Sequence, residues 1–159
     1  MGTENREFEE FVAVDVERLR RVLVSQYGLD IGSEAVDAAV AWAWERWPRI
    51  GGMNNPAGYL YRVAQTHAKR ALSRGRPIVL PVAVNDSNDA AASLPDVELI
   101  DALRELPVTQ RMVVLLVHAY GWTPSDVAHL TGMRAVTVRS NLYRALQTLR
   151  LNLPQGDPQ

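Results

Sequence analysis

A helical repeat of apolar residues runs through most of this sequence and stops at one polar stretch near its middle. Apolar positions recur every three or four residues on both sides of Asn85–Ser93, whereas that stretch has no such pattern. No segment has the sustained alternation of a sheet strand. Each flanking part holds about 60 to 70 residues, near the lower size limit for an independent domain. The sequence therefore predicts an all-α protein of two small helical domains, residues 1–75 and 96–152, joined by a flexible linker at 76–95 and followed by a disordered tail at 153–159.

Three helices are expected in the first part of the chain, over about Glu7–Gln26, Ser33–Arg46 and Pro56–Arg74. Gly28 and Gly32 are expected to bracket a break between the first two helices. Asn55 before Pro56 is typical of a helix start, because asparagine caps the first turn and proline lacks only an N–H that would have no helical partner.

Three tryptophans lie at the end of the second predicted helix and just after it. Trp44 and Trp47 follow the apolar stripe and are expected in the core, whereas Trp42 lies off the stripe and is a candidate contact for a partner. The alternative is an aromatic surface on which unstacked nucleobases could stack.

The second part of the chain has the pattern of a helix-turn-helix. Thr123 and Asp126 form a near capping box for a short helix that ends at Gly132, and a longer basic helix follows over about Ala135–Arg150. Packing of the apolar positions would leave a polar face that can reach base edges or phosphates in a major groove. DNA binding is therefore predicted, and the alternative is a plain helical hairpin.

Basic residues are concentrated in two places, although the formal net charge is only −1. Residues 46–85 contain seven Lys and Arg and no acid, and residues 127–150 contain four Arg and no acid. By contrast, residues 1–45 hold ten acids and four basic residues. The basic segments are two places where nucleic-acid phosphates could be neutralised, and the alternative is that they are solvated helix faces.

Several classes of protein are disfavoured by what the sequence lacks. It has no cysteine, so disulfide frameworks and thiolate chemistry are excluded. No apolar run is long enough for a membrane span, and the polar, acidic N-terminus is unlike a secretory signal, so a cytoplasmic location without membrane insertion is expected. His67, His118 and His129 have no metal-ligand spacing, and no catalytic motif is recognisable. We expect no catalytic residue, no metal, no cofactor and no enzymatic activity.

Both parts of the chain resemble known segments of one protein family. The second part resembles region 4 of the sigma-70 superfamily, and the first resembles region 2 of its extracytoplasmic-function (ECF) branch, which has only these two regions. The matching motifs in the second part are Leu106–Arg111, Gly121–Ala128, Gly132–Ser140 and Leu146, and those in the first part, within Phe8–Arg74, are Ala43–Trp47 and Asn55–Ala64. The resemblance covers about 110 of the 159 residues.

The resemblance implies an RNA polymerase sigma factor that directs promoter-specific transcription initiation. Its partners would be core RNA polymerase, through a coiled coil of the largest catalytic subunit and the flap, and promoter DNA. An anti-sigma factor is a candidate further partner. Region 2 would bind polymerase and recognise and melt the minus-10 element, and region 4 would recognise the minus-35 element.

Site residues carried over from the family fall into three groups. The residues implied for the minus-10 element are Met53, Asn54, Asn55, Arg62, Gln65, Lys69 and Arg70. Those implied for the minus-35 element, in the recognition helix, are Arg134, Thr137, Arg139, Ser140, Asn141 and Arg144. Those implied for polymerase binding are Glu34, Asp37, Trp42 and Arg46.

Departures from the family pattern keep two other functions open. The acidic stretch of the polymerase-binding helix retains only Glu34 and Asp37, and Val136 replaces a usual glycine. Arg134 stands where a serine cap is usual, and Asn141 where a basic residue is usual. A sigma-like adaptor or regulator that binds polymerase or DNA without initiating is therefore the main alternative. A dimeric helix-turn-helix repressor is another, with Phe8–Gln26 as the dimerisation helix.

Overall fold

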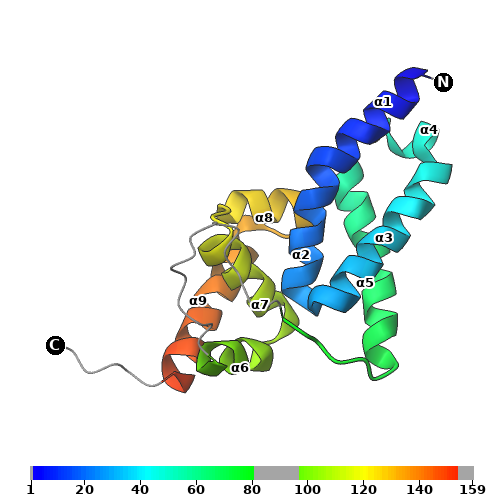
Figure 1. Ribbon diagram of the computed structural model, residues 1–159. Coiled ribbons are helices and arrows are strands. Elements are labelled where there is room, and N and C mark those ends of the chain that lie inside the picture. Colours follow the sequence, from blue (N-terminus) through cyan, green and yellow to red (C-terminus); the bar gives the residue numbers. More distant parts are fainter. Residues whose placement is uncertain (1, 81–96, 154–159) are drawn as a thin grey trace, which may run out of the picture.

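The computed structural model describes residues 2–80 and 97–153, and over these residues every regular element is a helix (Figure 1). The predicted all-α class is confirmed. Most of the predicted linker and nearly all of the predicted tail lie outside the described residues.

The elements of the first half of the chain are α1 (Gly2–Phe11), the π-helical turn η1 (Val12–Val16), α2 (Glu17–Tyr27), α3 (Leu29–Glu45), the short α4 (Trp47–Ile50) and α5 (Pro56–Ser73). In this half, α1, η1 and α2 follow one another as a continuous helical rod, α3 packs against α2, and α5 packs against α3. α3 packs against both α2 and α5, so the core of this half lies among these three helices.

The turn between α2 and α3 differs from the sequence-based prediction. Gly28 ends α2 with φ +87°, as expected for a glycine, but α3 then starts directly at Leu29 and continues through Gly32. The predicted break at Gly32 and the predicted start at Ser33 are therefore wrong. A Cβ on Gly32 would lie 2.7 Å from the carbonyl of Leu23, so this glycine permits close approach of two helices and does not end one.

The tryptophans also divide differently from the prediction. Trp47 is buried, and its ring centroid lies 5.0 Å from that of Phe11. Trp44 is 51% exposed, so its predicted place in the core is wrong. Its ring lies 4.8 Å from that of Phe8, on the outside of the α1–α3 contact. Trp42 is half-buried at the surface.

The second half is a compact group of short helices packed along a longer one. The elements are α6 (Val97–Glu105), α7 (Val108–Val114), the π-helical turn η2 (Leu115–Ala119), α8 (Pro124–Thr131) and α9 (Ala135–Asn152). α9 packs against α6, α7 and α8. Its buried Ala145 and Leu149 share a cluster with Leu103 of α6 and Leu115 of η2.

One hydrophobic core extends across both halves. α2 contacts α7 and η2, and α5 contacts α8, which agrees with their adjacent positions in Figure 1. Met112, Val113 and Leu116 of the second half are fully buried in the same cluster as the core of the first half. At the edge of this contact, the guanidinium of Arg18 lies 4.6 Å from the ring centroid of Trp122.

The first residues of the predicted linker also join the two halves. Val79 accepts a hydrogen bond at 2.7 Å from the backbone N–H of Leu29, at the start of α3. The next residue, Leu80, is buried in the core of the second half. Residues 76–80 therefore form a packed strap along the α2–α3 turn.

Arg111 is the one charged side chain that is buried among the described residues, at 1% exposure. Its Nη1 donates to the carbonyls of Leu103, Arg104 and Leu106 at 3.1–3.4 Å, around the end of α6. Its Nη2 donates at 2.7 Å to the carbonyl of Gln26, at the end of α2. Burial lowers the pKa of this guanidinium, which nonetheless stays charged at neutral pH. Arg111 therefore joins the carboxyl ends of two helices from different halves.

Replacing Arg111 by methionine should strongly destabilise the fold. The change keeps much of the volume but leaves buried carbonyls without donors, each at a cost of about 1 to 3 kcal/mol, so a loss of about 3 kcal/mol in the free energy of unfolding is expected. Urea denaturation measures this loss. Arg104→Met, which alters an exposed arginine on α6, is the control and should change stability by less than about 0.5 kcal/mol. Equal stabilities of the two variants would contradict this account of Arg111.

Candidate nucleic-acid interface

The short helix α8 is fixed at both ends by the residues that the sequence analysis selected. Thr123 Oγ1 accepts a hydrogen bond from the backbone N–H of Asp126 at 3.1 Å, and Asp126 Oδ2 accepts one from the N–H of Thr123 at 3.0 Å. This capping box is complete. Gly132 ends α8 in the left-handed region, at φ +77°. The predicted helix-turn-helix is therefore present, and its turn leads directly into α9.

α9 has one buried and one exposed face. Val138 is fully buried against α8, together with Val127 and Leu130. The predicted site residues on the exposed face are Arg134, Thr137, Arg139, Ser140 and Arg144. Asn141 is half-buried, and its amide donates to the carbonyl of Thr137 at 2.9 Å, one turn earlier in the same helix. Five of the six predicted residues therefore share a surface that is open to a ligand.

Sequence reasoning missed two exposed residues of this face. Val136 and Tyr143 are each 63% exposed, and Ser140 lies between them at helical spacing. Gln147 donates to the Tyr143 hydroxyl at 2.8 Å. The spacing 136, 140, 143 and 147 marks one stripe of a helix, so the pattern was available in the sequence once the buried face was assigned.

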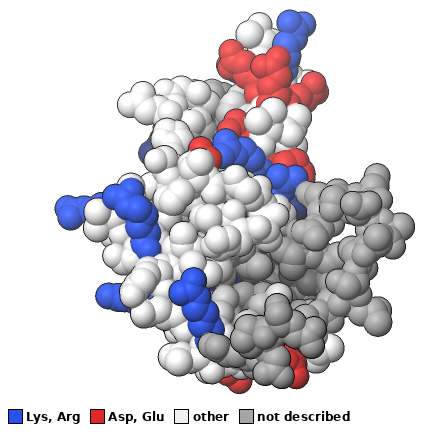
Figure 2. Space-filling model, turned by 90° about the vertical axis from the view of Figure 1, so that its left-hand side faces the viewer, with Lys and Arg blue, Asp and Glu red and all other residues white. Residues whose placement is uncertain are grey.

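The charge of this surface is positive. Arg134, Arg139, Arg144 and Arg150 lie in α9 or at its start without an acidic neighbour in the helix, and among the described residues none of them is ion-paired. Figure 2 shows this side of the molecule, with Lys and Arg over its lower part and most Asp and Glu gathered at the top, over α1. The arrangement suits a polyanion that lies along α9.

The first residues implied for the minus-10 element, Met53–Asn55, belong to the segment Ile50–Asn55, which lies where the two halves meet. Ile50 is buried and anchors its start, and Asn55 caps α5 by accepting from the N–H of Gly58 at 3.0 Å. The amide of Asn55 also donates at 3.1 Å to the backbone carbonyl of His129 in α8. The capping role predicted for Asn55 is confirmed, and its second hydrogen bond reaches the helix-turn-helix.

A cleft of about 250 Å³ adjoins this segment. Its lining residues from the first half are Met53, Asn55, Gly58, Tyr59 and Arg62, and those from the second half are Thr131 and Gly132. The remaining predicted residues lie at different depths. Asn54, Lys69 and Arg70 are exposed, whereas Gln65 is half-buried and donates to the hydroxyl of Tyr61 at 2.8 Å. Gln65 therefore belongs to an internal polar chain and not to the exposed basic face of α5.

These internal hydrogen bonds link α5 to α2. The hydroxyl of Tyr61 donates to Oε1 of Gln26 at 3.1 Å and accepts from Gln65. Burial raises the pKa of Tyr61 well above its usual value, so the hydroxyl stays protonated. These hydrogen bonds hold α5 in register with α2, and α5 carries Gly58, Tyr59 and Arg62 of the cleft.

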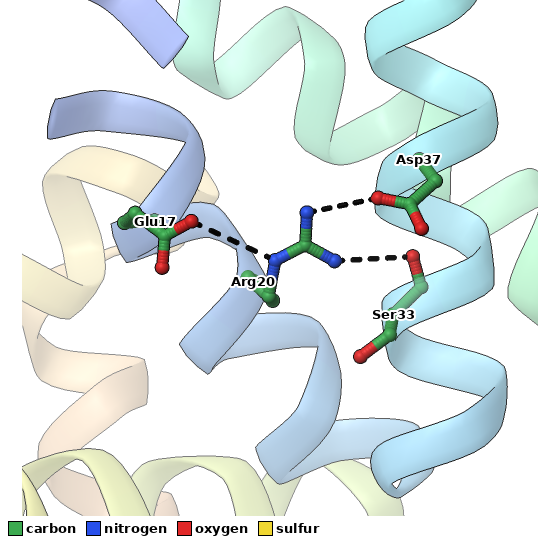
Figure 3. Close-up of polar contacts among 4 residues, drawn as sticks. All are labelled: Glu17, Arg20, Ser33 and Asp37. Atoms are coloured by element: carbon green, nitrogen blue, oxygen red, sulfur yellow. Dashed lines mark hydrogen bonds and ion pairs between the residues drawn. The ribbon is translucent and has the colours of Figure 1, made fainter. Parts of the chain in front are cut away.

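The four residues predicted to bind polymerase lie along α3 and at its end, and Glu34, Asp37 and Trp42 contact other elements of the chain. Asp37 accepts from Nη2 of Arg20 at 2.8 Å, while Nη1 of Arg20 donates to the carbonyl of Ser33 (Figure 3). Glu34 forms a two-point ion pair with Arg76 of the strap, which lowers the pKa of Glu34. Both carboxylates are more than half exposed, so these pairs can exchange with a partner.

Trp42 and Arg46 form a stacked pair on the same helix. The guanidinium of Arg46 lies 4.6 Å from the ring centroid of Trp42 and donates to the carbonyl of Trp42 at 3.1 Å. The other contact of the Trp42 ring is Tyr59 of α5, at 5.8 Å between centroids. This pair is rigid and lies at the surface, as a contact for a protein partner requires.

Neither a metal centre nor a membrane span is found in the part of the chain that the structure describes. No three His, Asp or Glu residues in 2–80 and 97–153 are grouped so that they could hold a metal ion. Within the same ranges, no helix combines the length and apolar character needed to cross a bilayer.

Comparison with known proteins links both halves to one family. Residues 96–149 match the family model described as "Sigma-70, region 4". The RNA polymerase sigma-E factor of Streptomyces antibioticus is 32% identical over 158 residues, which is 95% of this chain and 87% of that protein. The ECF RNA polymerase sigma factor SigL of Mycobacterium tuberculosis is 28% identical over 133 residues, 77% of this chain and 74% of SigL.

A solved structure has the same fold. The sigma factor RpoE of Bartonella quintana, crystallised in complex with the anti-sigma factor NepR, superposes with a TM-score of 0.63 over 92% of this chain and 96% of that chain. The sequences are 22% identical, so this likeness concerns the fold.

The capping box of α8 should make stability depend on pH through Asp126. The hydrogen bond from the Thr123 N–H lowers the pKa of Asp126 in the folded protein. The carboxylate therefore adds stability above the unfolded pKa, about 3.9, and this stability is lost as the pH falls through the folded value. Asp126→Asn should be less stable than the parent protein at pH 7, and the difference should shrink in acid.

Thermal unfolding between pH 7 and pH 3 measures this difference. Ser125→Ala, at the exposed neighbouring position, is the control because it changes no ionisable group. If the difference in unfolding temperature between Asp126→Asn and the parent protein stays constant down to pH 3, the carboxylate does not act as the predicted cap.

Proposed function

The chain belongs to the extracytoplasmic-function family of RNA polymerase sigma factors, and we propose that it reads promoters through the two surfaces described above. As a sigma factor it directs transcription initiation together with core RNA polymerase. The observation that carries the proposal is the exposed, basic face of α9, the second helix of a helix-turn-helix whose first helix, α8, is capped at both ends. Similarity to a sigma-E factor over 95% of the chain supports the same assignment for both halves.

α9 enters the major groove of the minus-35 element. Its first turns carry Thr137 and Ser140 on the exposed face, and the first residues of a recognition helix are those that reach base edges. Arg139, beside them, and Arg144, further along the helix, contact phosphates. Asn141 contributes less, because its amide is used within the helix.

The segment Ile50–Asn55 and the exposed basic residues of α5 bind the melted minus-10 element. A flipped base needs an apolar wall and hydrogen-bonding groups, which Met53 and the amides of Asn54 and Asn55 supply. In this structure, the amide of Asn55 is hydrogen-bonded to the carbonyl of His129, and Gly132 forms part of the opposite wall of the cleft. Promoter melting therefore requires the helix-turn-helix to move away from this segment.

α3 docks on the coiled coil of the largest polymerase subunit. Glu34 and Asp37 are exposed carboxylates, and each now pairs with an arginine of the same chain. Because such exposed ion pairs contribute little stability, basic residues of the polymerase can take the place of these arginines at a small cost in free energy. The second half docks on the flap. An anti-sigma factor is a further proposed partner. We also propose that the chain is not an enzyme and that it acts in the cytoplasm with the polymerase.

A sigma-like adaptor is the second candidate function. It is favoured by the contact with α8 that partly covers Asn55, because this contact obstructs the segment proposed to hold a flipped base. Such an adaptor would bind polymerase without starting transcription.

Co-purification with core RNA polymerase, followed by run-off transcription from genomic fragments, separates the two functions. A sigma factor gives discrete new start sites, and their upstream sequences identify both promoter elements. Binding without initiation supports the adaptor. Absence of binding to polymerase overturns both proposals.

Arg139→Gln should reduce the salt dependence of promoter binding by the holoenzyme. The slope of log K against log salt is negative, and removing one arginine–phosphate interaction reduces its magnitude by about 0.9. Filter binding or fluorescence anisotropy over a salt series measures the slope. Arg104→Gln is the matched control, because Arg104 is exposed but pairs with Asp101 on α6, outside the proposed DNA-binding face of α9. Equal slopes for the two variants would remove Arg139 from the DNA interface.

A further inference from the structure

Val136 is an apolar residue on the DNA-facing surface with no structural reason to be there. It is the second residue of α9 and is 63% exposed, so it contributes little to the core. Val138, two residues on, is the valine that closes the contact with α8. Valine is also a weaker helix former than alanine. The helix therefore carries an exposed branched side chain at a small cost in its own stability.

The surroundings of Val136 fit nucleic acid better than an apolar protein pocket. Thr137 and Ser140, which flank it on the exposed face, are hydrogen-bonding residues, and Arg134 and Arg139 lie within one turn. An apolar pocket on a protein would have to desolvate these cations, whereas duplex DNA neutralises them.

The major groove offers one apolar group along the base edges, the C5-methyl of thymine. Early residues of a recognition helix are those that approach base edges. The two γ-methyls of valine are held by a stiff χ1 angle, so binding restricts little further rotamer freedom. We propose that Val136 is a specificity-determining residue that packs against the C5-methyl of one thymine in the minus-35 element. This inference rests on the proposed function and adds a base identity to it.

Replacement of single thymines by deoxyuridine tests the contact directly, since uracil pairs as thymine does and lacks only the methyl group. The probe is a promoter found by run-off transcription, with each minus-35 thymine replaced in turn and the holoenzyme assayed for open-complex formation. At one position, deoxyuridine should weaken binding about fourfold, the equivalent of one buried methyl group at about 0.8 kcal/mol. Val136→Ala should weaken binding to the thymine promoter and should not respond to deoxyuridine at that position.

Leu151→Ala is the matched control, because Leu151 is an equally apolar residue of α9, 85% exposed and four turns further along the helix. It should keep the full response to deoxyuridine. Val136→Ala exposes no core and favours the helix, so both variants should fold, which circular dichroism checks.

Each other outcome overturns the inference in a recognisable way. If no thymine responds to deoxyuridine, or if Val136→Ala still responds, Val136 does not contact a methyl group. If Val136→Ala weakens both promoters equally, its partner is a protein surface. If the holoenzyme starts transcription at no fragment, the proposed function itself fails, and this inference fails with it.

Discussion

The buried guanidinium of Arg111 fixes how the two halves of this chain meet. A charge without water is costly unless its donors are satisfied, and here the acceptors are carbonyls at the carboxyl ends of α6 and α2. Those ends carry the negative pole of each helix, which adds favourable electrostatics. Because Nη1 and Nη2 belong to one planar group, the end of α2 at Gln26 and the end of α6 must stay within a few ångströms of each other.

The arrangement of the functional surfaces follows from that junction. Gln26, whose carbonyl binds Arg111, uses its side chain to accept from Tyr61, and Tyr61 sets the position of α5. α5 in turn places its cap, Asn55, against His129 of α8. The segment that would hold a flipped base and the helix-turn-helix that would read duplex DNA are thus parts of one packed unit. The exposed hydrogen bond between them contributes only about 1 kcal/mol. Most of the contact is the shared hydrophobic core, so separating the two surfaces would also expose residues such as Met112 and Val113.

Local chemistry was predictable from the sequence, and contacts between distant segments were not. The caps at Asn55, Thr123 and Gly132 were predicted correctly because each depends on a few neighbouring residues. The break predicted at Gly32 is absent because this glycine closely approaches the backbone of Leu23, a contact that one segment of sequence does not show. The apolar stripe predicts a buried Trp44, but the burial of this side chain is decided by where α1 and α4 pack. The hydrophobic core that both halves share, and the ion pairs of Glu34 and Asp37, depend on residues far apart in the chain. The periodicity of a sequence gives no information about such pairs.

The way acidic and basic residues are distributed over the surface limits how this chain can recognise DNA. The acids of α1 and the arginines of α9 lie at different parts of the surface, and the chain as a whole has a net charge of −1 (Figure 2). Long-range attraction of DNA to the whole molecule is therefore weak, and the arginines of α9 act only at close range, within about 8 Å at physiological salt. Phosphate contacts orient the helix but carry no sequence information. Under the proposed function, discrimination between minus-35 elements then comes from the few side chains of α9 that reach base edges. One methyl contact there, at about 0.8 kcal/mol, is comparable with the lower end of the roughly 1 to 3 kcal/mol that a mismatched base pair costs.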